Sequence, residues 1–166
     1  MTMRSRVALV GLLMAVTAGA RAQSPAPPPA TVSGTARGTF DVKLLPLDPE
    51  KKVEGATLGR MSIDKTFQGD LAGTSRGEML SALADVKGSG AYVAVEHVTG
   101  TLAGRKGSFT LHHRGIMTRG APDLAVTVVP DSGAGGLAGL TGRMQIDISD
   151  GKHHYVFEYT LPAATP

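Results

Sequence analysis

The feature that most constrains this chain is a repeated alternation of apolar and polar residues, broken at regular intervals by turn signals. Met61, Ile63 and Phe67, for example, alternate with Arg60, Ser62 and Asp64. This period of two is typical of a β-strand. Asp-Gly and other short glycine-containing sequences between such segments are typical of tight turns. The pattern predicts eight strands, over residues 35–45, 56–67, 71–83, 91–102, 108–118, 124–129, 140–148 and 152–161.

Eight strands joined mostly by short turns predict an all-β fold, an eight-stranded antiparallel up-and-down barrel. Closing the sheet removes the two long edges that an open sheet would expose. Glycines inside the strands, such as Gly59, Gly73, Gly100 and Gly142, suit the bends and close contacts of a small barrel. A sandwich of two sheets is the competing architecture.

The first 22 residues have the pattern of a cleaved secretory signal. Arg4 and Arg6 precede an uncharged apolar run from Val7 to Ala20, and Ala20-Arg21-Ala22 fits a cleavage site before Gln23. A membrane anchor is the alternative, but the run is shorter than the roughly 20 residues that span a bilayer. We therefore expect an exported protein, periplasmic or extracellular, with no membrane attachment after cleavage. A Pro/Ala linker (residues 23–34), the barrel domain (35–161) and a short tail (162–166) follow.

The charge of the chain does not indicate a nucleic-acid partner. The full sequence has 17 basic and 14 acidic residues, but Arg4, Arg6 and Arg21 lie in the predicted signal. The remaining chain is balanced, without the basic excess that binds phosphates, and aromatic residues are few. Cysteine is absent, so no disulfide supports the fold and no lipid-accepting Cys tethers it. Hydrophobic burial and strand pairing must stabilise the domain.

Alternation also assigns side chains to the inside of the predicted barrel. Its inner face is mostly apolar but includes a small polar group: Lys65, Ser75, Tyr92, Glu96, His113, Tyr155 and Tyr159. If the group is catalytic, we expect Glu96 to act as base or anchor, His113 as its titrating partner and Lys65 as a counter-charge. Ser75, Tyr92, Tyr155, Tyr159 and Phe109 would then contact a ligand. The alternative is an internal ion pair that is purely structural.

Three other motifs do not support a function. Gly73-Thr-Ser-Arg-Gly77 matches the G-x-S-x-G nucleophile elbow, but that elbow requires a strand-to-helix turn, and Ser75 lies mid-strand. In each of the pairs His112-His113 and His153-His154 the two side chains point to opposite faces of a strand, so neither pair chelates one ion alone. A cross-strand site that uses His113 and His153 is the alternative to a structural role. The glycine-rich segment from Gly133 to Gly142 has no following helix to bind a phosphate. We expect neither a metal nor a cofactor.

Several motifs in order resemble a bacterial family of unknown function, domain of unknown function 3224. They are Leu58–Phe67, Gly69–Leu80, Tyr92–Gly100, Gly104–His113 and Val128–Gly133, and the resemblance spans about residues 35–161. It implies a barrel similar to allene oxide cyclase and the dirigent proteins. The segment Pro130–Gly142 resembles the glycine-rich stretch that precedes a late strand in those barrels. The family supplies no established activity.

Three functions are compatible with these observations. The first is binding of a small, mostly apolar molecule in the barrel lumen. The second, suggested by analogy with the related barrels, is a cofactor-free isomerase or cyclase that uses Glu96 and His113. The third is a ligand-free structural barrel whose outer face forms a homo-oligomer. An open lumen favours the first two, whereas a lumen filled by Met61, Met79, Phe109, Phe157 and the tyrosines favours the third.

Overall fold

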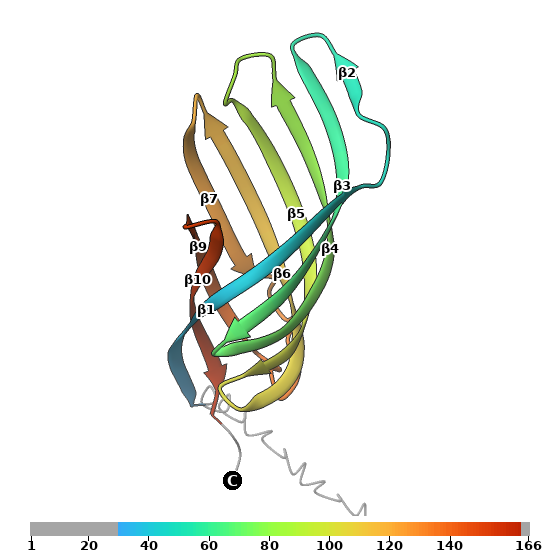
Figure 1. The fold of residues 1–166 in the computed structure, drawn as a ribbon. Helices are drawn as coiled ribbons and strands as arrows, with labels where there is room; N and C mark the ends of the chain where they lie inside the picture. Colours follow the sequence, from blue (N-terminus) through green and yellow to red (C-terminus); the bar gives the residue numbers. More distant parts are fainter. Residues whose placement is uncertain (1–29, 164–166) are drawn as a thin grey trace, which may run out of the picture.

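The described part of the chain consists of strands and turns. The computed structural model describes residues 30–163, and within them no helix is long and apolar enough to cross a membrane. A single antiparallel sheet runs through the whole domain (Figure 1). Its strands are β1 (Thr31–Pro46), β2 (Lys51–Val53), β3 (Ala56–Gly69), β4 (Leu71–Ala84), β5 (Gly90–Leu102), β6 (Arg105–Thr118), β7 (Ala121–Val128), β8 (Ala134–Gly135), β9 (Thr141–Ser149) and β10 (Lys152–Pro162).

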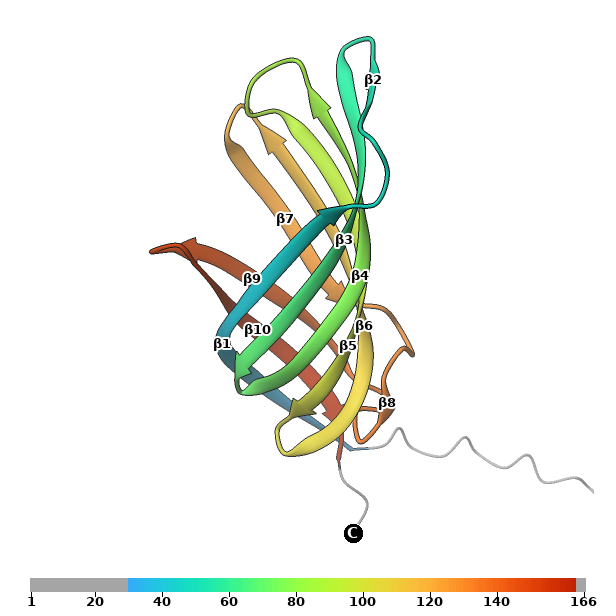
Figure 2. The same cartoon turned by 45° about the vertical axis from the view of Figure 1, so that its right-hand side comes forward.

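The sheet closes into a barrel because the long strand β1 pairs on both sides. Its first part pairs with β10, from Thr31 opposite Pro162 to Phe40 opposite His153, and its second part pairs with β3 up to Pro46 opposite Met61. β1 crosses the front of the barrel diagonally in Figure 1 and joins the two ends of the sheet in Figure 2. The predicted eight-stranded up-and-down barrel is confirmed, and a two-sheet sandwich is excluded.

The register fixes the stagger of the barrel. The stagger is found by following directly paired residues around the barrel from the pair Val126–Met144, which joins β7 to β9. In one direction the pairs lead from Met144 through Phe157 to Ala36 on β1. In the other direction they lead to Pro46, which is ten residues further along β1, through Val126, His113, Ala94, Met79 and Met61. A stagger of this kind tilts the strands steeply, and an eight-stranded barrel is then wide enough to hold side chains or one small ligand.

All eight predicted strands are present, with differences in one boundary and two additional short strands. β1 begins at Thr31, inside the predicted linker, because its backbone pairs with the last strand. The predicted charged loop after Pro46 contains the short outer strand β2, and the glycine-rich loop contains β8, which pairs with β6. The predicted turn at Asp150-Gly151 is confirmed, since both residues have positive φ angles of 51° and 71°. Residues 1–29, with the predicted signal, and 164–166 lie outside the described residues.

A row of glycines bends the wall sharply. Gly73, Gly100, Gly107 and Gly135 are paired in turn across β4, β5, β6 and β8. A Cβ atom on Gly73 would meet the backbone of Thr99 and Gly100 on the next strand. Such close approach of two backbones allows the strong coiling that closes a small barrel, and side chains there would prevent it.

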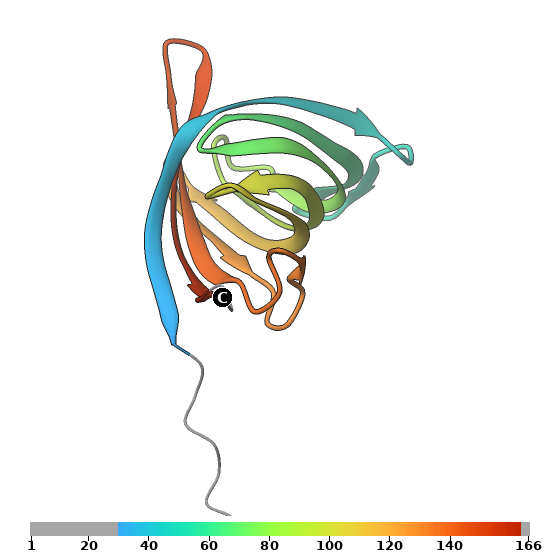
Figure 3. The same ribbon diagram turned by 90° about the horizontal axis from the view of Figure 1, so that it is seen from below.

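Side chains fill the lower half of the barrel. We call lower the end that contains the turns at Gly69–Asp70 and Ala103–Gly104. Phe109 and Phe157 stack inside it with ring centroids 5.7 Å apart, and both are fully buried. Leu137 and Leu140 from the segment after β7 are buried in the same apolar cluster. The end-on view in Figure 3 shows the wall curving around this interior. The core thus fills one end of the barrel.

The upper half of the wall is interrupted between β7 and β9. The two strands share only the pairs Val126–Met144 and Thr127–Arg143, whereas β7 pairs with β6 along its whole length. Above Val126 the β9–β10 hairpin turns away from β7, as Figure 2 shows. This divergence, which we call the seam, leaves the upper inner surface less enclosed than the lower one.

Candidate functional site

Four polar side chains from neighbouring strands meet inside the barrel. Nζ of Lys65 on β3 lies 2.9 Å from Oε1 of Glu96 on β5, and Nε2 of His113 on β6 lies 3.1 Å from the same oxygen. The hydroxyl of Ser75 on β4 donates to Oε2 of Glu96 at 3.0 Å. The four residues are at most 5% exposed. We call them the Glu96 cluster, and its members are four of the residues predicted from the sequence.

The strand registers explain why these residues meet. Lys65 is directly opposite Ser75, and Glu96 is opposite Gly77, two positions along β4 from Ser75. Gly77 has no side chain, and a Cβ there would meet Cβ of Glu96. The carboxylate therefore has room to lie between strands β3 and β6 and to accept from both sides. This position makes Glu96 the common acceptor of the cluster.

The cluster is electrostatically satisfied. Glu96 accepts one bond from a cation, one from an imidazole and one from a hydroxyl, so both of its oxygens are occupied. Among the described residues, no buried side-chain nitrogen or oxygen lacks a hydrogen-bond partner. A buried charge is tolerated when it is paired and hydrogen-bonded in this way, and removing one partner is expensive. The arrangement favours an ordered ion-pair network over an unoccupied catalytic base.

The environment shifts the pKa values of this region in opposite directions. Burial alone would raise the pKa of Glu96, but the hydrogen bond from His113 and the charge of Lys65 outweigh it and hold that pKa below 4.5. Burial lowers the pKa of Lys65, and Glu96 offsets part of the effect. Burial, and then the negative charge of Glu96, raises the pKa of Tyr92. Near neutral pH we therefore expect an ionised Glu96 beside a neutral Tyr92 hydroxyl.

Aromatic rings cover the remaining side of Lys65. Its Nζ lies 4.7 Å from the ring centroid of Phe40 and 5.8 Å from that of Phe67, within the range of cation–π attraction. The ring of His153 stacks on Phe40 at 4.9 Å between centroids. Phe40 is not among the candidate residues predicted from the sequence. The available signal is the alternation of Phe40, Val42 and Leu44 with Asp41 and Lys43.

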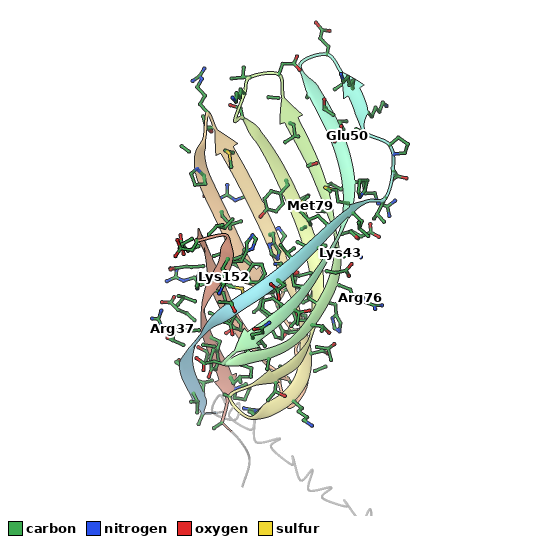
Figure 4. The ribbon with its side chains drawn as sticks, in the orientation of Figure 1. Arg37, Lys43, Glu50, Arg76, Met79 and Lys152 are labelled. Carbon is green, nitrogen blue, oxygen red and sulfur yellow. The ribbon has the colours of Figure 1, made fainter. Side chains whose placement is uncertain are left out.

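Above the cluster, the barrel wall presents apolar side chains that point inward without being buried. Leu44, Met117, Leu124 and Ile148 are between 38 and 66% exposed, although their strand positions face the interior. Half-buried residues complete this surface. We call it the upper inner face, and it consists of Val42, Leu44, Met61, Met79, Tyr92, Met117, Leu124, Ile146, Ile148 and His153. Met79 is labelled at this end of the barrel in Figure 4.

Tyr92 is positioned by a glycine. It is directly opposite Gly115 on β6, and its ring occupies the space where a side chain of residue 115 would be. The same arrangement recurs for Tyr155 against Gly38 and Tyr159 against Gly34. Aromatic residues that cover a cross-strand glycine hold both strands in register. Tyr92 therefore lies flat against the wall, beside the Glu96 cluster and below the open end.

The structure separates three of the predicted ligand contacts from the cluster. The hydroxyl of Tyr155 accepts a bond from the backbone amide of Leu71 at 2.9 Å and lies within 3.3 Å of the Gln68 and Leu71 carbonyls, so it supports the β3–β4 turn. Phe109 stacks on Phe157 in the filled lower half. Tyr159 packs on Phe157 with centroids 5.7 Å apart. These residues take part in core packing.

The other sequence motifs have structural explanations. Ser75 is in the middle of β4 and bonds to Glu96, which confirms that Gly73–Gly77 is not a nucleophile elbow. Within residues 30–163, no group of three or more His, Asp or Glu side chains is arranged to hold a metal ion. Two shallow hollows of about 570 and 580 Å³ lie on the wall beside Thr99 and Lys106 and beside Thr35 and Glu158. Neither is lined by the Glu96 cluster.

Fold and site together define a class: a closed eight-stranded barrel with a filled lower half, a neutralised buried carboxylate and an open apolar upper half. The sequence matches the model of the family described as "Protein of unknown function (DUF3224)" over residues 36–159. The chain belongs to this family, as the sequence motifs predicted. No curated protein matches the sequence.

A solved structure has a similar fold. It is the crystal structure of a protein with unknown function from the DUF3224 family of Shewanella oneidensis MR-1. The two chains are 52% identical, with a TM-score of 0.73, and the match covers 77% of this chain and 97% of that one. The barrel is therefore shared by two members of the family. The predicted similarity to allene oxide cyclase remains a prediction.

Proposed function

We propose that this protein binds a small, uncharged and mostly apolar molecule on its upper inner face. The observation that carries the proposal is the exposure of Leu44, Met117, Leu124 and Ile148 on inward-facing positions. Soluble proteins rarely expose contiguous apolar surface without a partner for it. A concave apolar wall with a few polar groups at its base has the general character of a small-molecule site.

The charge distribution selects a neutral ligand. None of the ten residues of the upper inner face is Asp, Glu, Lys or Arg, and its polar groups are the Tyr92 hydroxyl and the His153 ring. The charges beneath it neutralise one another, because Lys65 is paired with Glu96. A ligand carboxylate or ammonium would lose its hydration without gaining a counter-charge, which is costly. A single hydrogen bond with Tyr92 can orient a neutral ligand.

Two further features favour binding. Met61 and Met79 are directly opposite each other on β3 and β4, and methionine side chains adapt readily to ligands of different shape. The seam between β7 and β9 gives an apolar molecule a lateral route to the upper inner face. The filled lower half limits the ligand to the upper part of the barrel. The upper inner face thus combines an apolar wall with access from outside.

The Glu96 cluster supports the binding function over a cofactor-free isomerase. A general base needs an oxygen within hydrogen-bond distance of the substrate, but Glu96 is fully buried and is surrounded by Lys65, Ser75 and His113, which all bond to it. In this proposal Glu96 orders the base of the site, and burial together with the charge of Glu96 raises the pKa of the Tyr92 hydroxyl beside it. We further propose that the protein acts outside the cytoplasm, on the basis of its first 22 residues alone.

A pair of fluorescent probes tests this proposal. N-phenyl-1-naphthylamine is neutral, and 8-anilinonaphthalene-1-sulfonate has the same rings with an anionic group. We expect the neutral probe to bind to the purified protein with at least roughly tenfold higher affinity than the anionic one, since an unpaired buried charge costs more than 1.4 kcal/mol. Equal affinity for both probes, or no binding of the neutral probe, would contradict the proposal.

Neighbouring leucines supply a matched pair of variants. Leu44 and Leu45 are consecutive on β1 and are 41 and 46% exposed, but Leu44 faces the barrel interior and Leu45 faces outward. Leu44→Lys should weaken binding of the neutral probe, whereas Leu45→Lys should leave it unchanged. An equal effect of both substitutions would locate the probe outside the upper inner face.

A further inference from the structure

Two polar atoms at the base of the upper inner face have no partner among residues 30–163. Nε2 of His113 bonds to Glu96, but the other ring nitrogen, Nδ1, takes part in no hydrogen bond there, and neither does the hydroxyl of Tyr92. In the same part of the chain, no side-chain nitrogen or oxygen that is shielded from solvent lacks a partner. Both atoms are therefore reached by solvent, although His113 is only 1% exposed.

The strand register brings the two side chains close together. Tyr92 on β5 is opposite Gly115 on β6, and His113 is two residues below Gly115 on the same strand and the same inward face. The Tyr92 ring lies over Gly115, so it leans from β5 toward the strand that holds His113. The charge of Glu96 contributes to the raised pKa of Tyr92, which requires the hydroxyl to lie near the Glu96 cluster. Both atoms thus face the same region.

The bond to Glu96 determines which nitrogen of His113 carries a hydrogen. The ionised carboxylate of Glu96 only accepts hydrogen bonds, so Nε2 is the donor. Glu96 is already neutralised by Lys65, and a second proton on the imidazole would leave one buried positive charge without a counter-charge. The ring is therefore neutral, with its hydrogen on Nε2. Nδ1 is left as a bare acceptor at the base of the site.

This pair of atoms specifies the polar group of the ligand. We propose that the ligand is an apolar alcohol whose hydroxyl donates to Nδ1 of His113 and accepts from the hydroxyl of Tyr92. The inference rests on the proposed function, which it makes more specific. A ligand that covers the base of the site displaces solvent from Nδ1, and an ether, ketone or ester has no hydrogen to give in return. Nδ1 would then be buried without a partner, which lowers affinity.

Naphthalene derivatives of similar shape test the inference on the full-length wild-type protein. Displacement of N-phenyl-1-naphthylamine near neutral pH gives the affinities of 1-naphthol, 1-methoxynaphthalene and naphthalene. We expect 1-naphthol to bind at least about tenfold more tightly than 1-methoxynaphthalene, which accepts a hydrogen bond but donates none. Equal affinities would overturn the inference and leave the apolar site in place. Failure of N-phenyl-1-naphthylamine to bind would overturn both.

Variants separate the contributions of the two atoms. His113→Gln keeps an N–H group for Glu96 but removes the Nδ1 acceptor, so the preference for 1-naphthol over 1-methoxynaphthalene should fall below about threefold. Tyr92→Phe removes only the hydroxyl and should weaken both compounds by roughly threefold or more, with naphthalene unaffected. His112→Gln is the matched control, because His112 is the next residue on β6 and points outward. It should keep the full preference.

Circular dichroism checks that each variant is folded. A preference for 1-naphthol that His113→Gln leaves intact would contradict the role of Nδ1. So would a loss of preference in the folded His112→Gln protein, since that side chain lies outside the barrel.

The ring nitrogens of His113 can also be observed directly in the wild-type protein. Long-range proton–nitrogen NMR spectra distinguish a ring nitrogen that carries a hydrogen from one that does not. We expect a hydrogen on Nε2 and none on Nδ1, and a shift of the Nδ1 signal when 1-naphthol binds but not when 1-methoxynaphthalene binds. A hydrogen on Nδ1 in the free protein, or an Nδ1 signal that 1-naphthol leaves unchanged, would overturn the inference.

Discussion

The ammonium of Lys65 and the carboxylate of Glu96 form an ion pair of 2.9 Å in the middle of the barrel, with side-chain exposures of 3 and 0%. The pair joins β3 to β5 across the intervening strand β4, which contributes Ser75. In a buried pair of this kind the two charges attract each other strongly, but both side chains lose their hydration when the protein folds. Its consequences for stability can be measured directly.

Removing one partner of the pair should destabilise the protein strongly. Lys65→Met leaves the buried Glu96 without its cation, and we expect a loss of about 3–5 kcal/mol in the free energy of unfolding. Urea denaturation followed by circular dichroism measures it. The double variant with Glu96→Gln should lose clearly less than the sum of the two single variants. Additive losses would mean that the two residues act independently.

The pH dependence of stability should carry the signature of Glu96. Its folded-state pKa lies below the ordinary value of 4.5, so the unfolded chain binds the proton more readily. The stabilisation is complete above about pH 4.5 and is lost as the pH falls through the folded-state pKa. The difference in unfolding free energy between wild type and Glu96→Gln should therefore shrink below pH 4.5. A difference that grows on acidification would contradict this assignment.

Tyr92 and Gly115 should depend on each other. A methyl group at residue 115 would occupy the space of the Tyr92 ring, so Gly115→Ala should destabilise the protein by about 1–3 kcal/mol. In a Tyr92→Ala background the same substitution should cost much less, because the ring is gone. Thermal unfolding of the four proteins gives the coupling energy. Equal costs in both backgrounds would show that the glycine is required for another reason.

The Tyr155 hydroxyl should contribute to stability rather than to binding. It accepts from the amide of Leu71 and reaches the Gln68 carbonyl at the base of the β3–β4 turn. Tyr155→Phe leaves that buried amide without a partner, at a cost of about 1–3 kcal/mol. Affinity for N-phenyl-1-naphthylamine should be unchanged, since the residue lies outside the upper inner face. A loss of probe binding without a loss of stability would mean that Tyr155 contacts the ligand.

The alternation of residues was sufficient to predict the face of each site residue but not its height in the barrel. Lys65, Ser75, Glu96 and His113 were all assigned inward, and the structure brings them together. Tyr155 and Phe109 were also assigned inward, yet they lie in the lower half. Height depends on the stagger between strands, which is set by long-range register and is not visible in any one strand.

Long-range closure also explains what the sequence did not predict. β1 pairs with β10 and with β3, and this double pairing extends it to Thr31 and brings Phe40 over Lys65. The alternation within residues 35–45 predicts a strand but gives no information on its partners. The seam between β7 and β9 follows from the same global geometry. It leaves inward-facing residues such as Leu124 and Ile148 exposed, and the proposed ligand site includes them.

Native mass spectrometry of the protein, purified gently from the host that produces it, tests the binding function most directly. We predict a reproducible additional mass that is released on denaturation and corresponds to an uncharged, mostly apolar molecule, with the signal reduced in Leu44→Lys and retained in Leu45→Lys. A protein that carries no additional mass at any charge state, and that does not bind N-phenyl-1-naphthylamine, would contradict the account.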